Sequence, residues 1–145
     1  MEVYTIGFTK RSAASFFGAL RAKGIRRLID VRLNNSSQLA GFTKQEDLRY
    51  FLRELCGADY LHEPMLAPTV EILNSYKKNG AEWSEYERRF LALMDDRRPD
   101  LKLDRGLFQV PTVFLCSEAR PDHCHRCLVA EYLQRKWGDL EIIHL

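Results

Sequence analysis

The amino-acid sequence predicts an α/β fold, a single-domain three-layer sandwich with a mostly parallel central sheet flanked by helices. Short runs of apolar and β-branched residues alternate with amphipathic helical segments, and strands separated by helices pair in parallel. The length of 145 residues corresponds to one domain, expected to span residues 1–145. A chain of this length buries about two-thirds of its unfolded surface, so it needs neither disulfides nor a metal to fold.

Five short strands are expected, each rich in β-branched or aromatic residues. They cover residues 3–7, 28–31, 60–62, 112–116 and 141–144. The run TVFLC at 112–116, in which four apolar residues follow Thr112, indicates the most deeply buried strand. Functional residues of parallel sheets gather beyond the carboxyl ends of the strands. This rule directs attention to Thr9, Arg32, His62, Cys116 and Glu118.

Helices are expected between these strands, where capping residues precede an amphipathic pattern. They cover residues 13–23, 44–55, 70–78, 86–94 and 121–137. Ser12 can cap the first of them, and residues 43–46 and 84–87 have the spacing of capping boxes. Pro121 is placed in the first turn of the last helix, where proline is tolerated. The charged segment 97–106 is expected to be a surface connection.

Composition and charge exclude several classes of protein. Hydrophobic residues make up 46% and charged residues 29%, as in soluble globular proteins and unlike disordered or fibrous chains. A net charge of +2 does not indicate non-specific binding to nucleic acid or to a membrane surface. The first residues begin a strand pattern rather than a signal peptide, so we expect a cytoplasmic protein. Its four cysteines are then expected to be free thiols, metal ligands or catalytic groups rather than disulfides.

The segment CSEARPDHCHRC, which begins at the end of a strand and enters a helix, has the densest set of reactive side chains. Cys116 and Glu118 follow the strand, and Cys124, His125 and Arg126 open the helix. Unpaired N–H groups there attract anions and, with the basic neighbours, favour a thiolate. A thiolate beside a carboxylate and an imidazole has the parts for nucleophilic catalysis. Equally, the cysteines can be small buried apolar residues while the charged groups cap the helix.

Zinc is an alternative that the spacing does not favour. Five residues of this segment could supply four ligands: Cys116, His123, Cys124, His125 and Cys127. Structural zinc sites usually combine two separated pairs of ligands, such as two CxxC motifs. Here the second pair is missing unless Cys116 or the distant Cys56 joins Cys124 and Cys127. No metal ligand is therefore assigned, and the cofactor is left unspecified.

A second feature is the LIDVR strand, in which Asp30 and Arg32 point to the same face. They could orient each other and bind an anionic group, or form a structural ion pair. His62 either lines the same cleft or is a hydrogen-bonded histidine at a turn. Three aromatic residues at helical spacing are expected in the core: Trp83, Tyr86 and Phe90. Four arginines are expected on a solvated face: Arg88, Arg89, Arg97 and Arg98.

Three motifs together resemble the domain of unknown function 488 family over residues 3–145. They are YTIGFT at the start, LIDVR with a polar loop ending in GF, and CSE-x-x-P-x-x-CHR followed by LVAEYL. The resemblance implies a compact cytosolic α/β domain without a settled activity. The family pattern falls on Gly7, Asp30, Arg32, Cys116, Glu118, Pro121, Cys124, His125 and Arg126. Phe8 stands where many members have histidine, and Cys127 where arginine is common.

The favoured hypothesis is an enzyme that acts on an anionic, phosphate- or nucleotide-bearing substrate at the strand ends. Its catalytic groups are expected to be Cys116, Glu118, Cys124 and His125. Its substrate-binding groups are expected to be Thr9, Asp30, Arg32 and Arg126. The alternative is a non-catalytic module that binds an anion, nucleic acid or a metal with the same residues. A structural role in a larger assembly has no positive signal in the sequence.

Overall fold

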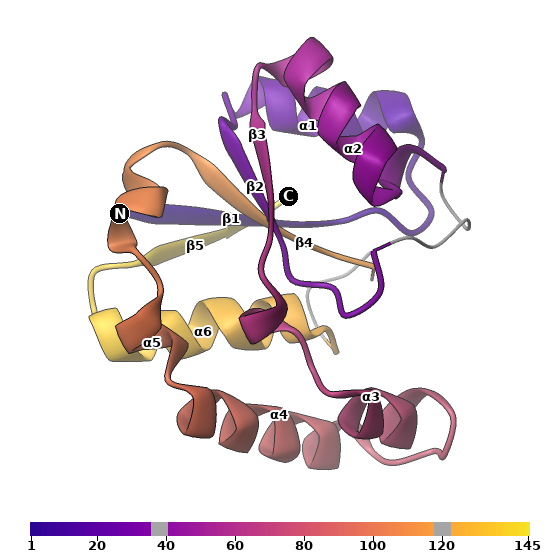
Figure 1. The fold of residues 1–145 in the computed structure, drawn as a ribbon, viewed down its shortest axis with the longest axis vertical. Helices are drawn as coiled ribbons and strands as arrows, with labels where there is room; N and C mark the ends of the chain where they lie inside the picture. The colour runs from indigo at the N-terminus through magenta and orange to yellow at the C-terminus, as the bar shows by residue number, and fades with distance from the viewer. Residues whose placement is uncertain (36–40, 118–122) are drawn as a thin grey trace.

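In the computed structural model, which describes residues 1–35, 41–117 and 123–145, five strands form one sheet (Figure 1). The strands are β1 (Glu2–Gly7), β2 (Arg27–Asp30), β3 (Asp59–His62), β4 (Thr112–Cys116) and β5 (Glu141–His144). Their order in the sheet is β3-β2-β4-β1-β5, and every pair is parallel. The predicted α/β sandwich is therefore confirmed, with β4 as its central strand.

Six α-helices of the described residues surround this sheet. They are α1 (Ala13–Ala22), α2 (Gln45–Phe51), α3 (Val70–Lys77), α4 (Trp83–Arg97), α5 (Pro99–Lys102) and α6 (His125–Trp137). Helices α1 and α2 cover one face, whereas α6 lies against the other face, with α4 and α3 outside it (Figure 1). A π-helical turn, Leu52–Cys56, extends α2 toward β3.

Two separate cores explain why the strands are so apolar. Along β4, Phe114 and Cys116 face the core under α6, while Val113 and Leu115 face the core under α1 and α2. Successive side chains of a strand point to opposite faces, so a strand covered on both faces must be apolar throughout. This arrangement explains the continuous TVFLC run and buries β4 completely.

The helix starts depart from the sequence prediction in two places. Ser12 and Thr69 cap α1 and α3 through their side-chain oxygens. Neither predicted capping box forms: α2 begins after Lys44, and α4 after Glu82, so Ser84 lies inside its helix. Thr43 lies instead in the preceding 3-10 turn, Gly41–Thr43, and its carbonyl accepts a hydrogen bond from the buried guanidinium of Arg32.

The segment 97–106, expected to be a surface connection, has mostly exposed residues, but it also contains the short helix α5 and two buried residues. Pro99 begins α5 and is buried, as is Leu103 four residues later. Pro99 is compatible with a helix because it occupies the first helical position, where no N–H is needed. Arg97 is not fully solvated either, because its guanidinium donates to the carbonyls of Met65 and Ala67 at 2.9 and 2.7 Å.

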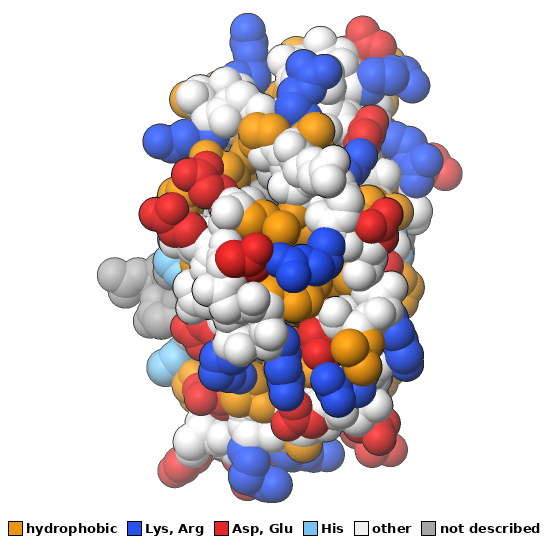
Figure 2. Space-filling view, turned by 90° about the vertical axis from the view of Figure 1, so that its left-hand side faces the viewer, with side chains coloured by type: hydrophobic (Ala, Val, Ile, Leu, Met, Phe, Trp, Pro, Cys, Tyr) orange, Lys and Arg blue, Asp and Glu red, His pale blue; other side chains and the backbone are white. Residues whose placement is uncertain are grey.

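The last helix, α6, begins at His125 rather than at Pro121. Residues 118–122 lie outside the described residues, as do residues 36–40 of the expected polar loop. Among the described residues, no helix combines the length and the apolar character needed to cross a membrane. Figure 2 shows positive and negative side chains interspersed on the face that it presents, in keeping with the small net charge of +2.

Candidate functional site

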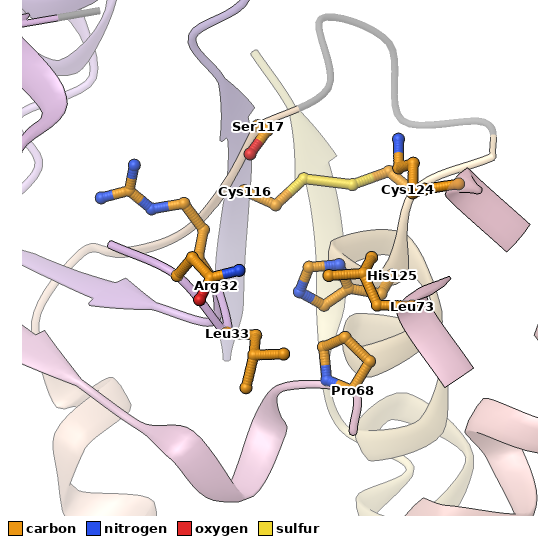
Figure 3. Close-up of a pocket in the computed structure, with 10 residues that line it drawn as sticks. Arg32, Leu33, Pro68, Leu73, Cys116, Ser117, Cys124 and His125 are labelled. Carbon is orange, nitrogen blue, oxygen red and sulfur yellow. A yellow bond between two sulfur atoms is a disulfide. The ribbon is translucent and has the colours of Figure 1, made fainter. Parts of the chain in front are cut away.

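The carboxyl end of β4 and the start of α6 bring three reactive side chains together. Cys116 is the last residue of β4, Cys124 is the N-cap of α6 and His125 is its first residue. Their ligand atoms all lie within 4.8 Å of one another, and we call them the Cys–Cys–His cluster. Both cysteines are buried, and Figure 3 shows the imidazole beside them.

The two cysteines of this cluster are joined by a disulfide, which corrects the expectation that all four would be free. The parallel topology explains the pairing, because strand ends and the helix starts that follow them meet at one edge of the sheet. The remaining cysteines, Cys56 and Cys127, are free and half-buried. Burial and the Glu131 carboxylate raise the pKa of Cys127 to about 12, and burial also raises the pKa of Cys56.

Arg126 lies directly behind the disulfide. Its side chain is fully buried, and its Nη1 donates a hydrogen bond to Sγ of Cys116 at 3.3 Å. A cation at this distance favours the thiolate when the disulfide is reduced. Arg126 is not one of the described residues that line the neighbouring pocket. One nitrogen of the guanidinium thus contacts the sulfur, and the role of Arg126 in substrate binding stays a prediction.

The ring of His125 is held in one orientation by the backbone of β2. Its Nε2 lies 2.7 Å from the carbonyl oxygen of Val31. A carbonyl can only accept, so Nε2 is the donor of this hydrogen bond and Nδ1 is the ring nitrogen directed away from the carbonyl. The ring also packs at a tilt against Phe90, 5.7 Å between centroids. The imidazole is thus pre-oriented as a base or a ligand.

A pocket of about 100 Å³ opens over the cluster (Figure 3). Besides the cluster, its polar lining residues are Arg32, Asn34, Lys77 and Ser117, and the remaining described lining is apolar. Lys77 ends α3 and is exposed, so it contributes positive charge at the rim. The described lining residues include no carboxylate, and this composition suits an anionic ligand better than a cationic one.

Asp30 and Arg32 form a buried ion pair at the end of β2. Nε and Nη2 of Arg32 donate to the two carboxylate oxygens of Asp30, both at 2.9 Å. The hydroxyl of Tyr60 donates to the same carboxylate at 2.6 Å, and Nη2 of Arg32 also donates to the Thr43 carbonyl at 2.7 Å. The guanidinium points away from the disulfide (Figure 3). The pair joins β2, β3 and the start of α2, and only part of Arg32 borders the pocket.

The other residues predicted at the strand ends have varied positions. The amide and hydroxyl of Thr9 both donate to the carbonyl of Ser117, which ties the segments after β1 and β4 together. Nε2 of His62 lies 2.8 Å from the carbonyl oxygen of Arg32. Of the two alternatives for His62, the structure therefore supports a hydrogen-bonded histidine at a turn. Glu118 lies outside the described residues, and its predicted role is not addressed by the structure.

The predicted aromatic core is confirmed for Tyr86 and Phe90, which are buried. Trp83 is only partly buried and stacks on the ring of His123, with centroids 5.0 Å apart. Sequence reasoning missed Lys77 as a lining residue, because the last turn of α3 has no motif that points to the end of β4. Only the packing of α3 outside α6 brings it there.

The structure also narrows the set of candidate metal ligands. Of the five residues considered for zinc, Cys116, Cys124 and His125 converge. The thiol of Cys127 instead donates to Oε1 of Glu131 at 3.2 Å, one turn along α6. The Cys–Cys–His cluster is thus the set of described side chains in which three potential metal ligands lie within 4.8 Å of one another.

A comparison with models of protein families gives an independent identification. Residues 12–133 match the family described as Domain of unknown function DUF488. Comparisons with curated proteins and with solved structures returned no match. The match covers well over half of the chain and includes the LIDVR strand, the cluster and most of α6. The chain therefore belongs to the DUF488 family, as its sequence motifs predicted.

Proposed function

We propose that this DUF488 domain is a thiol-dependent enzyme that acts on a small anionic substrate at the carboxyl edge of the sheet. The observation that carries the proposal is the convergence of two cysteine sulfurs and one imidazole beneath a pocket with a basic rim. Buried cysteines with a purely structural role do not require a guanidinium at the sulfur or an oriented histidine beside it.

Each group of the site has a distinct role in this proposal. With the disulfide reduced, Cys116 is the nucleophile, because the Arg126 guanidinium stabilises its thiolate. His125 transfers the proton, and Cys124 is the residue bonded to Cys116 in the disulfide form, which an external thiol must reduce before Cys116 can act. Glu118 was the other candidate acid or base, and His125 is preferred because its position is known.

The substrate class follows from the pocket. A volume of about 100 Å³ is well below the roughly 300 Å³ at which sites for drug-sized ligands begin, so the pocket suits one small anionic group. Lys77 and the N-terminal N–H groups of α6 supply the positive potential. Asp30 holds Arg32 and thereby shapes the edge of the pocket, and Thr9 fixes the segment that contains Ser117. A phosphate or carboxylate at the end of a larger molecule would fit this description.

The first test is the rate at which each cysteine of the reduced protein is alkylated by iodoacetamide at neutral pH, followed by peptide mass spectrometry. Cys116 should react at least about tenfold faster than Cys56 and Cys127, whose pKa values are raised by burial. The Cys116→Ser variant should lose the fast phase, while Cys127→Ser should keep it. Equal rates at all four cysteines would overturn the proposal.

The second test addresses the substrate class with inorganic phosphate as the probe. Millimolar phosphate should slow alkylation of Cys116, and Lys77→Gln should weaken that protection. Lys78→Gln is the matched control, because Lys78 is exposed on the same helix end but does not line the pocket. Protection by phosphate without any enhanced thiol reactivity would replace the enzyme with the alternative, a non-catalytic anion-binding module.

A further inference from the structure

We infer that the reduced Cys–Cys–His cluster binds one zinc ion, and that the ion keeps both thiolates unreactive until it is removed. Metal binding is inferred from geometry alone, whereas its effect on reactivity rests on the proposed function. The disulfide, the free dithiol and the zinc-bound form would then be three exclusive states of the same two sulfurs. The site lies beneath the pocket, between β4 and α6.

The donor set is the first argument. Two thiolates and one imidazole are ligands that zinc prefers, with Zn–S near 2.3 Å and Zn–N near 2.0–2.1 Å. Ligand atoms at those distances around a tetrahedral ion lie roughly 3.3–3.8 Å apart. The three ligand atoms of the cluster already lie within 4.8 Å of one another. Small side-chain rotations therefore suffice to surround an ion once the disulfide is reduced.

The spacing of the backbone is the second argument. The Cα atoms of Cys116 and Cys124 lie 7.5 Å apart, whereas disulfides usually span about 4.4–6.8 Å. Cys116 at the end of β4 and Cys124 at the start of α6 are both buried in the core under α6, so this separation is a property of the fold. Two thiolates that share an ion need a wider separation than two bonded sulfurs, and the fold provides it.

The surroundings of the ligands are the third argument. Histidines that bind metals normally donate their other ring N–H to a backbone carbonyl or carboxylate, which fixes the ring and the tautomer. Nε2 of His125 has such a partner in the carbonyl of Val31, at 2.7 Å, which makes Nδ1 the nitrogen suited to bind. Nη1 of Arg126 donates to Sγ of Cys116, a hydrogen bond that a metal-bound thiolate can also accept. Both cysteines are buried, which limits competition from water.

The fourth coordination position would face the pocket. The thiol of Cys127 donates to Glu131 instead. Among the described residues, no fourth histidine, cysteine or carboxylate side chain joins the three ligand atoms of the cluster. Water or a small anion would therefore complete the shell. A site with three protein ligands differs from a closed four-ligand structural site in this open position, which faces exchangeable solvent.

The test is the zinc content of the reduced, full-length chain after excess zinc is removed by gel filtration. About one zinc ion per chain is expected. Cobalt as a probe should give an intense tetrahedral visible spectrum with a thiolate charge-transfer band. The Cys116→Ser, Cys124→Ser and His125→Ala variants should lose most of the metal, while Cys127→Ser and His123→Ala should retain it. The oxidised wild-type chain, with the same fold and no free thiolates in the cluster, should bind none.

The outcomes for zinc and for the proposed function are separable. Zinc should slow alkylation of Cys116 and Cys124 by about tenfold or more and leave Cys56 and Cys127 unchanged. Fast alkylation without stoichiometric zinc would overturn the metal site and leave the enzyme proposal standing. Stoichiometric zinc with unchanged alkylation would overturn the block. Equal metal content in Cys116→Ser and wild type would show that zinc binds elsewhere and would also overturn the inference.

Discussion

His144 shows how one side chain can make stability depend on pH. Its Nδ1 lies 2.5 Å from the hydroxyl of Thr5, at the end of β5. Burial lowers the pKa of His144 below its ordinary 6.5, and the positive charge of Arg126 lowers it further. The unfolded chain then binds a proton more readily than the folded chain as the pH falls through about 6.5. The free energy of unfolding should therefore decrease below that pH, in part because of this residue.

Replacing His144 by Gln should remove that part of the decrease. Urea unfolding of wild type and His144→Gln at pH 7.5 and pH 5.5 measures it, with the change between the two pH values as the readout. The variant should lose less stability than the wild type over this interval. An identical loss in both proteins would contradict the assigned direction of the pKa shift.

At the scale of elements, Asp100 joins the short helix α5 to α6. Its carboxylate accepts hydrogen bonds from Arg98 at 2.8 Å and from the hydroxyl of Tyr132 at 2.7 Å. The pKa of Asp100 is lowered to about 2, and the hydrogen bond from Arg98 is the largest cause. Burial alone would raise this pKa, whereas the hydrogen bond from Tyr132 lowers it further. This stabilisation is present above the unfolded pKa near 3.8 and is lost as the pH falls toward 2.

The Asp100→Asn variant should therefore lower the free energy of unfolding at neutral pH by about 1–3 kcal/mol, because a charged, buried acceptor is lost. Tyr132→Phe should cost about 1 kcal/mol, because only one neutral donor is removed. Asp96→Asn is the matched control on exposed α4 surface and should change stability by less than about 0.5 kcal/mol. Equal effects of Asp100→Asn and Asp96→Asn in urea unfolding would refute the link between α5 and α6.

At the scale of the whole molecule, the sheet separates two cores to which different helices of the described residues contribute. Phe16 of α1 lies in the core on one face, and Phe90 of α4 lies in the core on the other, both fully buried. Phe16→Leu and Phe90→Leu should each cost about 1–2 kcal/mol, because each leaves a small cavity. Residues without shared contacts have additive effects, so the double variant should equal the sum within about 0.5 kcal/mol.

Urea unfolding of the two single variants and the double variant closes this cycle. A coupling energy above about 1 kcal/mol would mean that the sheet transmits strain between its faces. The strand β4 would be the element through which it passes, because its alternate side chains belong to the two cores. The same cycle, repeated after reduction of the disulfide, shows whether the site at the end of β4 depends on both cores.

Much of the fold could be predicted from local patterns. The five strands and the side-chain caps of α1 and α3 follow from β-branched runs and from Ser12 and Thr69, which act over three residues. The predictions that failed were those that a distant contact overrides. Thr43 lies in the 3-10 turn before α2, where its carbonyl accepts a hydrogen bond from Arg32, and Pro99 is buried because α6 packs against α5.

The sequence by itself determined the class of the fold, the family and the segment that contains the site, because these depend on periodicity and on residue types close together in the chain. Only the tertiary structure decided which side chains of that segment meet. It joined Cys116 with Cys124 and fixed His125 on the carbonyl of Val31 from a different strand. It also brought Lys77 to the pocket and placed the Tyr60 hydroxyl and the Thr43 carbonyl on the Asp30–Arg32 pair. The physical reason is that side-chain partners depend on packing and burial between elements, which no spacing along the chain specifies.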